Sequence, residues 1–357
     1  MNGVYARVVP AIWPVSLPCR IALVAQAPQE HECEQNRPFQ GMSGLILDGA
    51  LKSANIDRAA CLQTFVYDTK LEENLVARER SKRGSSWDAF HEGNLDRLAA
   101  ELQKAGPNVV VPMGTTALNA LKGSTSIQKL RGQPTMGEGR FANFKLVPTF
   151  DPNFIVKQYH MSHVLIGDLN RAAAEAEIGP HIEYPRRLLN VAPSIGEVEA
   201  YVETAAGAPL LSCDIETWFN PDNDLVPKFI RGVSFAHSEE EAIYVPFISM
   251  NTLTRCYWPD VATERRAWDA VRAILHNPVP KLGQNFGSFD APWLLSRMGI
   301  RVRNYCHDLR LLHKTLYPEL PASLQFMGNS YSRQGSWKHW SKESGVREKA
   351  RGAKRDE

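Results

Sequence analysis

Apolar positions in the first half of the chain fall into two alternating kinds of segment. Short runs of apolar residues predict buried strands, and longer segments with apolar residues three and four apart predict helices. The expected strands cover 20–28, 108–114 and 144–150, and the expected helices cover 41–54, 115–122 and 162–176. Thr115 is a suitable N-cap for the second helix. Strands that alternate with helices predict a three-layer α/β domain with a largely parallel sheet, whose ligands bind at the carboxyl ends of the strands.

The pattern changes after a polar stretch at 178–185 that is flanked by prolines, and we place a domain boundary there. Beyond it, three apolar segments separated by short polar links predict an antiparallel meander, and helical patterns follow. The expected strands cover 208–216, 229–237 and 241–247, and the expected helices cover 262–275, 288–298, 307–316 and 322–330. This order predicts an α+β domain over 186–340, after a first domain over 1–180. The charged tail at 341–357 has one apolar residue, Val346, and is expected to be disordered.

Composition narrows the class of protein but leaves its partner open. Hydrophobic residues make up 43% of the 357 positions and charged residues 22%, which is ordinary for a globular protein in solution. The N-terminal residues lack the pattern of an export signal, and the six cysteines show no paired spacing, which argues against a disulfide framework or a zinc ribbon. We therefore expect a cytoplasmic protein, of a bacterium or a phage-infected cell, with no membrane contact. The net charge of +2 does not by itself indicate a nucleic-acid partner.

Acidic residues follow the apolar strand at 208–216. Asp214 and Glu216 flank Ile215, and both side chains are expected to reach forward where the strand ends. Further along, Asn285 precedes Asp290 by five residues at a predicted turn from strand to helix. Acidic side chains at the end of a buried strand need a cation or a shell of hydrogen bonds. The two groups together therefore predict a functional site.

These two motifs, in this order, resemble the first two exonuclease motifs of proofreading domains of polymerase I-like enzymes, in the DnaQ-like (ribonuclease H-like) superfamily. The resemblance continues from about Arg187 through 307–309 to 320–331. It implies metal-dependent 3′-5′ hydrolysis of DNA in which Asp214 bridges two metal ions, Glu216 and Asp290 complete one side each, and Asn285 contacts the nucleic acid. Oxygen ligands and a phosphate substrate favour Mg²⁺ or Mn²⁺.

The third motif of that family, Tyr-x-x-x-Asp, is missing. The last tyrosine is Tyr331 and the fourth residue after it is Gly335, whereas Asp356 and Glu357 have no tyrosine ahead of them. Whether Tyr331 or His339 replaces the lost motif stays open. The chain ends about where a proofreading domain would lead into a polymerase, as in phage-type DNA polymerases, and this favours a truncated or split polymerase reading frame with a polymerase chain as a partner.

Residues 24–48 resemble the first motif region of family 4-type uracil-DNA glycosylases. The matching residues are Ala27, Pro28, Glu32, Pro38, Phe39, Gly41, Gly44 and Leu47. The segments 112–118 and 148–153 stand in the places of the central strand and helix and of the second motif, so the resemblance covers about 20–178. It implies a pocket in which a flipped base stacks on Phe39 and its edge is read by hydrogen bonds.

The polar positions of this glycosylase pattern are altered. Gln26 stands in place of a glutamate, Asp151 in place of a histidine, and Phe65 in place of the asparagine that reads uracil. These changes are hard to reconcile with uracil excision, and the cysteine spacing does not fit the iron-sulphur cluster of many family members. Gln26, Phe39 and Asp151 are nevertheless candidate nucleic-acid-binding residues. Phe39 is equally well explained as a core residue, and a turn or helix-cap role before Pro152 explains Asp151 better than a catalytic acid does.

The sequence therefore predicts an α/β, three-layer, parallel-sheet uracil-DNA-glycosylase-like domain followed by an α+β ribonuclease H-like exonuclease domain, in a protein of DNA replication or repair. Three functions stay open. The first is an exonuclease that acts on single-stranded 3′ ends, with the first domain as a docking platform for DNA. The second is an inactive module that binds single-stranded DNA or a polymerase, and the third is a glycosylase with altered base choice.

Overall fold

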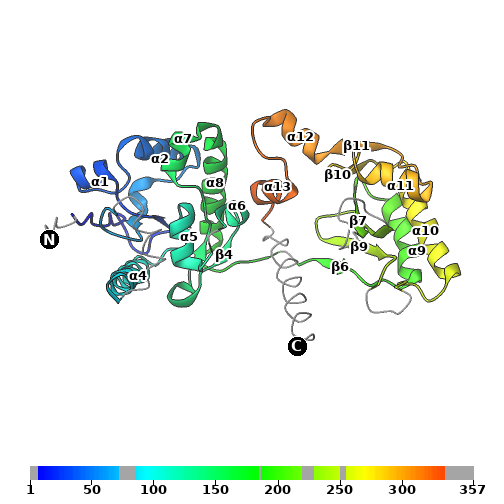
Figure 1. Ribbon diagram of the computed structural model, residues 1–357, viewed down its shortest axis with the longest axis horizontal. Helices are drawn as coiled ribbons and strands as arrows, with labels where there is room; N and C mark the ends of the chain where they lie inside the picture. Colours follow the sequence, from blue (N-terminus) through cyan, green and yellow to red (C-terminus); the bar gives the residue numbers. More distant parts are fainter. Residues whose placement is uncertain are drawn as a thin grey trace. The chain divides into compact units, whose positions relative to one another are not determined.

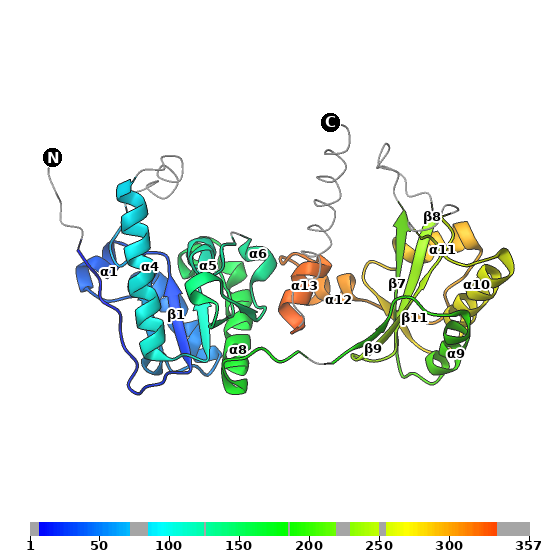
Figure 2. The ribbon, with the colours of Figure 1, turned by 90° about the horizontal axis from the view of Figure 1, so that it is seen from below.

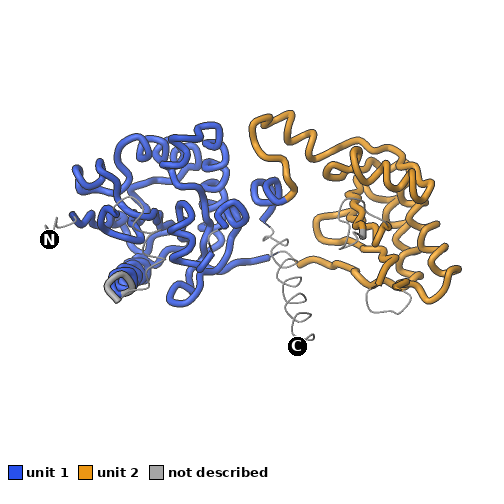
Figure 3. Tube along the Cα trace, viewed as in Figure 1, with its two compact units in different colours: residues 1–184, 325–357 blue, residues 185–324 orange. Residues whose placement is uncertain are grey.

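The computed structural model describes residues 7–71, 85–124, 126–184, 186–218, 229–249 and 255–333. The chain forms two compact units, the first made of Met1–Tyr184 with Gln325–Glu357 and the second of Pro185–Leu324 (Figure 3). Within the ranges described, every helix is too short or too polar to cross a membrane. The tail at 341–357, which was expected to be disordered, lies outside those ranges.

The first unit is built on a five-stranded sheet in the order β2-β1-β3-β5-β4. Its strands are β1 (Ile21–Ala25), β2 (Leu62–Phe65), β3 (Val109–Pro112), β4 (Thr135–Met136) and β5 (Lys145–Leu146). All neighbouring strands are parallel except β4, which runs antiparallel to β5. Every residue of β1, β2 and β3 is buried. Burial on both faces explains why these strands are continuous apolar runs rather than alternating ones.

Helices cover both faces of this sheet. Figure 1 shows α2, α7 and α8 on one side and α4 and α5 on the other. The helices are α1 (Glu30–Gln35), α2 (Gly41–Ser53), α4 (Ser85–Ala105), α5 (Gly114–Lys122), α6 (Ile127–Leu130), α7 (Pro152–Lys157) and α8 (Ser162–Ile178), with short 3₁₀ turns at Arg58–Ala60, Gly139–Phe141 and Tyr159–Met161. Helix α5 begins one residue before the predicted cap: Met113 is the N-cap, and Gly114 has a φ of +86°, so Thr115 lies inside the helix.

The second unit contains a six-stranded mixed sheet in the order β11-β10-β7-β8-β9-β6. Its strands are β6 (Leu188–Asn190), β7 (Leu211–Trp218), β8 (Phe229–Ala236), β9 (Glu241–Pro246), β10 (Lys281–Gly283) and β11 (Tyr305–Asp308). The run β7-β8-β9 is antiparallel, and the pairs β7-β10, β10-β11 and β6-β9 are parallel. Its helices are α9 (Ile195–Ala206), α10 (Val261–His276), α11 (Asp290–Met298) and α12 (Leu309–Leu316) (Figure 2).

One face of the antiparallel strands packs on α9 and α10 to form the core of the second unit. Side chains alternate along β7, so that Cys213 and Ile215 are buried in this core whereas Asp214 and Glu216 are exposed on the other face. The parallel sheet with helices on both faces, followed by an antiparallel meander with helices after it, confirms the predicted fold class.

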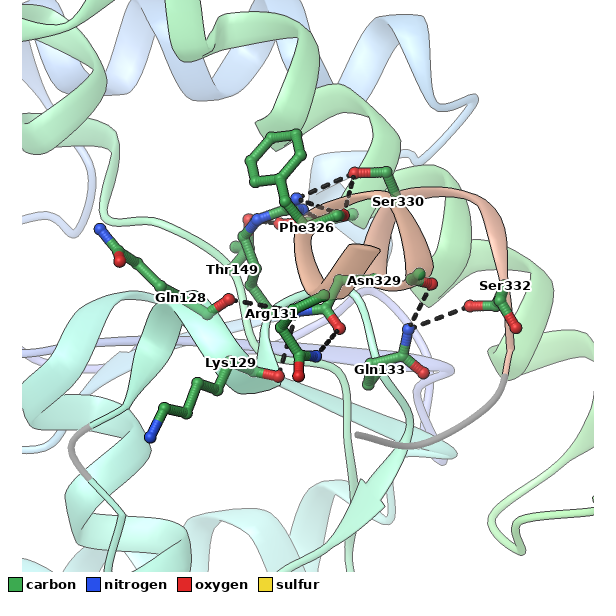
Figure 4. A network of polar contacts seen from close by, with 12 residues as sticks. Gln128, Lys129, Arg131, Gln133, Thr149, Phe326, Asn329, Ser330 and Ser332 are labelled. Carbon is green, nitrogen blue, oxygen red and sulfur yellow. Dashed lines mark hydrogen bonds and ion pairs between the residues drawn. The ribbon is translucent and has the colours of Figure 1, made fainter. Parts of the chain in front are cut away.

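Helix α13 (Leu324–Tyr331) returns to the first unit, in which the described residues from Gln325 onward are packed. The Nδ2 of Asn329 donates to the carbonyl oxygens of Gln128 and Lys129 at 3.1 and 3.0 Å. The Nε2 of Gln133 donates to the carbonyl oxygens of Gly328 and Ser332, both at 3.0 Å (Figure 4).

Arg131 anchors the same helix through a buried charge. Its guanidinium donates to Ser330 Oγ at 2.9 Å and to Asp168 Oδ1 at 2.8 Å, and it lies 4.3 Å from the ring centroid of Phe326. The sequence grouped residues 322–330 with the second domain because their helical spacing shows that a helix forms but not which unit it packs against. The hydrogen-bond partners of Asn329 lie 201 and 200 positions earlier in the chain, so no local pattern indicated this contact.

Candidate active site

The two acidic residues of the first exonuclease-like motif lie side by side on the open face of β7. Alternate residues of a strand project to the same side, which brings Asp214 and Glu216 to one face. Strand β7 continues past both of them to Trp218, with a shift in its pairing to β8 between Glu216 and Thr217. The acids therefore project from the middle of the strand, and the expectation that they reach forward from its end was wrong.

The third predicted carboxylate, Asp290, is attached to the same strand. Strand β10 pairs with β7 at Leu211 and Ser212. Beyond that point, the Ile215 N–H donates instead to Asp290 Oδ1 at 2.9 Å. Asp290 is the first residue of α11 and is 3% exposed. The hydrogen bond therefore fixes the Asp290 carboxylate against the backbone between Asp214 and Glu216.

Burial raises the pKa of Asp290 to about 6, because the charged carboxylate loses its hydration. The hydrogen bond from Ile215 N lowers this pKa, whereas the negative charges of Asp308 and Glu216 raise it further. Asp290 and Glu216 therefore repel each other electrostatically, although one lies on α11 and the other on β7. A cation bound beside Asp290 would favour the charged form of its carboxyl group.

This pKa predicts how the stability of the second unit depends on pH. Since the folded pKa of Asp290 lies above its ordinary value, the protonated carboxyl contributes stability that is fully present below about pH 4 and is lost as the pH rises through about 6. Asp290→Asn keeps an oxygen acceptor for Ile215 N and carries no charge. We expect the variant to be more stable than wild type at pH 8 by about 1–3 kcal/mol, and equally stable near pH 4.

Urea unfolding in EDTA, followed by tryptophan fluorescence at both pH values, measures this difference, because four of the eight tryptophans lie in the second unit: Trp218, Trp258, Trp268 and Trp293. Asp269→Asn, at an exposed position of α10, is the matched control and should change little at either pH. If Asp290→Asn is less stable than wild type at pH 8, the buried charge of Asp290 does not destabilise the folded protein, which would contradict this account.

The predicted nucleic-acid contact, Asn285, occupies the turn between β10 and α11 in the left-handed conformation, with a φ of +61°. Its N–H donates to Asp308 Oδ1 at 3.0 Å, and Tyr305 donates its hydroxyl to Asp308 Oδ2 at 2.8 Å. Arg310 Nη1 donates to Asn285 Oδ1 at 2.7 Å. The sequence assigned no role to Asp308. Asp308 is the last residue of β11 and the N-cap of α12, where its Oδ1 also accepts from Arg310 N at 2.9 Å. An aspartate at the start of a helical pattern is a typical cap, and this was the one signal in the sequence that pointed to it.

The oxygen atoms of the three predicted carboxylates are of the type that binds a hard divalent cation, but the side chains are not already arranged around a common point. Asp214, Glu216 and Asp290 offer only carboxylate oxygens, the ligands that Mg²⁺ and Mn²⁺ prefer. In the part of the chain that the structure describes, no three His, Cys, Asp or Glu side chains are arranged closely enough to hold a metal ion. Of the candidates for the missing third motif, Tyr331 lies on α13, and His339, Asp356 and Glu357 lie outside the described residues.

The first unit brings its three predicted site residues into one pocket. Gln26, Phe39 and Asp151 line a cavity of about 370 Å³ at the carboxyl ends of the strands. The other lining residues are Ala25, Ala27, Gln29, Glu32, Ser43, Phe65, Pro152, Asn153, Val156 and Lys157. The cavity therefore stands where the resemblance placed a base-binding pocket, and Phe65 is part of its wall.

The wall of this pocket includes aromatic rings and polar groups whose orientation is fixed by hydrogen bonds. Phe39 is 3% exposed, and its ring centroid lies 5.5 Å from that of Phe65. Arg58 Nη2 donates to the Phe39 carbonyl oxygen at 2.9 Å. Gln26 Oε1 accepts a hydrogen bond from Thr116 Oγ1 at 3.0 Å, which sets the orientation of its amide. Phe65 thus packs on the ring that was expected to stack a base.

The acidic residues of the pocket bind backbone amides. Asp151 is the N-cap of α7 and accepts from Asn153 N at 2.8 Å, and burial raises its pKa. Glu32 is 3% exposed and accepts from the N–H groups of Gln29 and Gln40 at 2.8 and 3.3 Å. Of the two interpretations of Asp151, the helix cap is the one seen in this geometry.

We expect no release of uracil from DNA by this pocket, because Phe65 supplies no hydrogen bond to a base edge and Asp151 is committed to α7. Incubation with uracil-containing single-stranded DNA, followed by alkaline cleavage at abasic sites, measures base release. Strand breaks at uracil that persist in Asp214→Ala and disappear in Phe39→Ala would contradict this prediction, since they would place a working glycosylase in the first unit.

Comparison with known proteins identifies the first unit. Residues 15–176 match the family model described as the uracil DNA glycosylase superfamily. The first unit contains a uracil-DNA-glycosylase-like domain. This glycosylase-like domain is also similar to a type-4 uracil-DNA glycosylase of Thermotoga maritima, at 26% identity over 161 residues that cover 44% of this chain and 78% of the relative. The predicted resemblance is confirmed for this domain.

A second relative matches a longer stretch of the chain. A DNA polymerase of Bacillus phage SP01 is 26% identical over 204 residues, which cover 56% of this chain and 21% of the polymerase. The chain therefore spans about a fifth of that relative. Similar solved structures include the EXD2 exonuclease domain soaked in Mg and GMP, at TM-score 0.26 and 20% identity over 38% of this chain and 62% of that one. Escherichia coli RNase D has TM-score 0.30 and 14% identity over 42% and 34%.

Proposed function

We propose that the second unit is a metal-dependent 3′-5′ exonuclease that shortens single-stranded DNA. The observation that carries this proposal is the hydrogen bond from Ile215 N to Asp290 Oδ1, which attaches a buried carboxylate to the strand that presents Asp214 and Glu216. The negative charges of Asp214 and Glu216 on one face of β7 and of Asp290 at the backbone of the same strand repel one another, and a cation would stabilise them. The sequence similarity to a phage DNA polymerase supports a DNA substrate.

In the proposed reaction, a water oxygen forms a bond to the phosphorus of the last linkage, and the bond from phosphorus to the 3′ oxygen of the preceding nucleotide breaks. One proton of the water ends on that 3′ oxygen, which becomes the new 3′-hydroxyl, and a nucleoside 5′-monophosphate leaves. Asp214, Glu216 and Asp290 would hold Mg²⁺ or Mn²⁺, which lowers the pKa of water and stabilises charge on the phosphate when bound. The Ile215 N–H holds Asp290 in place, so this carboxylate needs little reorganisation. Asn285, fixed by Asp308, would contact the strand being shortened.

The glycosylase-like domain would serve this activity as a platform that docks DNA. Its cavity has aromatic walls, and unpaired bases stack on aromatic rings without regard to sequence. Partners of the protein would be single-stranded 3′ ends and a DNA polymerase chain. A second candidate function, a module that binds single-stranded DNA without cutting it, is favoured by one observation: within the described ranges the carboxylates do not form a ready metal-binding group.

Digestion of end-labelled single-stranded DNA tests the proposal. With Mg²⁺ or Mn²⁺, a 5′-labelled strand should yield a ladder that shortens from its 3′ end, a 3′-labelled strand should lose its label as a mononucleotide at once, and EDTA should stop both. Internal fragments without early loss of the 3′ label would indicate an endonuclease. Intact DNA that is retained on the protein would support the binding module in place of the exonuclease.

A further inference from the structure

A tyrosine of β9 faces the same side of the sheet as the acidic residues. Directly paired residues in antiparallel strands project to the same face. Asp214 pairs with Ser234, and Ser234 pairs with Tyr244, so the three form one row across β7, β8 and β9. Glu216 begins the next row, in which it pairs with Gly232. Tyr244 is half-buried, as expected of a side chain that lies along the sheet.

Gly232 lets the Tyr244 ring lie across β8 toward Glu216. A Cβ at Gly232 would stand 2.3 Å from both the Cζ and the hydroxyl oxygen of Tyr244, and 2.6 Å from its Cε2. Real side chains do not approach so closely, so any larger residue would displace the ring. The phenol therefore occupies the space that the side chain opposite Glu216 would otherwise fill.

The charges around this phenol suit a hydrogen-bond donor. Burial raises the pKa of Tyr244, the Arg231 guanidinium lowers it, and the Glu216 carboxylate raises it. The phenol hydroxyl has a proton that it can donate, and the ring lies over Gly232, the residue paired with Glu216. Ser234, the other hydroxyl in this row, donates to the Asp214 carbonyl oxygen at 3.3 Å.

We propose that Tyr244 is a substrate-contacting residue whose hydroxyl donates a hydrogen bond to a non-bridging oxygen of the phosphate at the 3′-terminal linkage. This inference rests on the proposed function, since it places the phosphate at the face of Asp214 and Glu216. The proton stays on the tyrosine throughout. Gly232 is the matching specificity element, because it leaves room for the ring.

Single-turnover cleavage of a 5′-labelled single strand in Mg²⁺ tests this contact. Loss of a hydrogen bond to a charged phosphate should slow Tyr244→Phe by about 10- to 100-fold. Gly232→Ala, which displaces the ring, should slow cleavage similarly. Tyr201→Phe removes a phenol hydroxyl that is bonded to His237 elsewhere in the second unit, and should stay within about twofold of wild type.

Phosphorothioates at the terminal linkage separate a contact from a structural effect. If the hydroxyl binds one non-bridging oxygen, sulphur at that oxygen already weakens the bond, and Tyr244→Phe then costs much less for one diastereomer than for the oxygen substrate. An equal loss for oxygen and for both sulphur diastereomers would overturn the contact, as would a Tyr244→Phe rate within about twofold of wild type.

The failure of the proposed function is distinguishable from the failure of this inference. If wild type cuts no substrate, the exonuclease proposal fails, and the contact is measured instead as affinity for the same strands with Ca²⁺ in place of Mg²⁺. Weaker binding by Tyr244→Phe, selective for one diastereomer, would keep the phosphate contact without catalysis. Equal affinity of Tyr244→Phe and wild type for all strands would overturn it.

Discussion

Asp214→Ala is expected to slow 3′-5′ cleavage of single-stranded DNA by a factor of about 10³, the scale of losing a group that stabilises the reacting phosphate. Asp214 is exposed on β7, so its replacement should not disturb the core that Cys213 and Ile215 form beneath it. Affinity for DNA should be unchanged or higher, because the alanine removes a negative charge that repels phosphate. Single-turnover cleavage and fluorescence anisotropy measure the two effects separately.

Asp269→Ala is the matched control for charge, since this acid is exposed on α10 of the same unit. It should leave the cleavage rate within about twofold of wild type. Cleavage by Asp214→Ala at the wild-type rate would show that β7 is not part of the active site. Loss of DNA binding along with cleavage would show that Asp214 acts on the fold rather than on the chemistry.

Arg131→Met is expected to destabilise the glycosylase-like domain by about 3–5 kcal/mol, because it leaves a buried carboxylate without its cation. Arg131 and Asp168 are 1% and 3% exposed, and Thr149 Oγ1, at 2.9 Å from Asp168 Oδ2, would be the remaining side-chain donor to this acid. The same change removes the hydrogen bond to Ser330, so α13 should lose its anchor. Hydrogen exchange resolved by peptide should show faster opening in α8 and α13.

Two further variants serve as controls for Arg131→Met. Arg131→Met combined with Asp168→Asn removes both charges and should be less destabilising than Arg131→Met alone. Arg266→Met breaks an ion pair with Glu199 whose side chains are 53% and 41% exposed, and should cost less than about 1 kcal/mol. Unchanged exchange in α13 of Arg131→Met would contradict the anchoring of this helix by the buried arginine.

The helices and strands that could be predicted are those in which buried apolar residues recur at a regular spacing along the chain. Strands β1 and β3 are apolar at every position, and the apolar spacing of α10 matches its buried face. The spacing of α11 was recognised too, although its start at Asp290 came two residues after the predicted one. Helix α9 was missed because its exposed residues outnumber its buried ones, and β11 because four residues are too few for a pattern. Strand β10 was expected only as the strand before the turn at Asn285, without bounds.

The candidate site could be predicted where residue type alone carries the chemistry. Asp214, Glu216 and Asp290 are carboxylates in a recognised order, and Gln26, Phe39 and Asp151 do line one cavity. Tyr244 could not be found in this way, and for Asp308 the sequence offered only a helix-cap position. The position of Tyr244 depends on the pairing of β8 with β9, and the role of Asp308 depends on its contact with Asn285. A local sequence pattern does not show which distant residues will be paired.

Binding of Mn²⁺, measured by electron paramagnetic resonance in the presence of single-stranded DNA, tests most directly whether the three carboxylates of the second unit act together. The wild-type protein should bind Mn²⁺, and Glu216→Gln combined with Asp290→Asn should weaken this binding at least about tenfold, because each replacement removes a charged oxygen ligand. Equal binding of Mn²⁺ by the wild type and the double variant would contradict a shared metal site on β7 and α11.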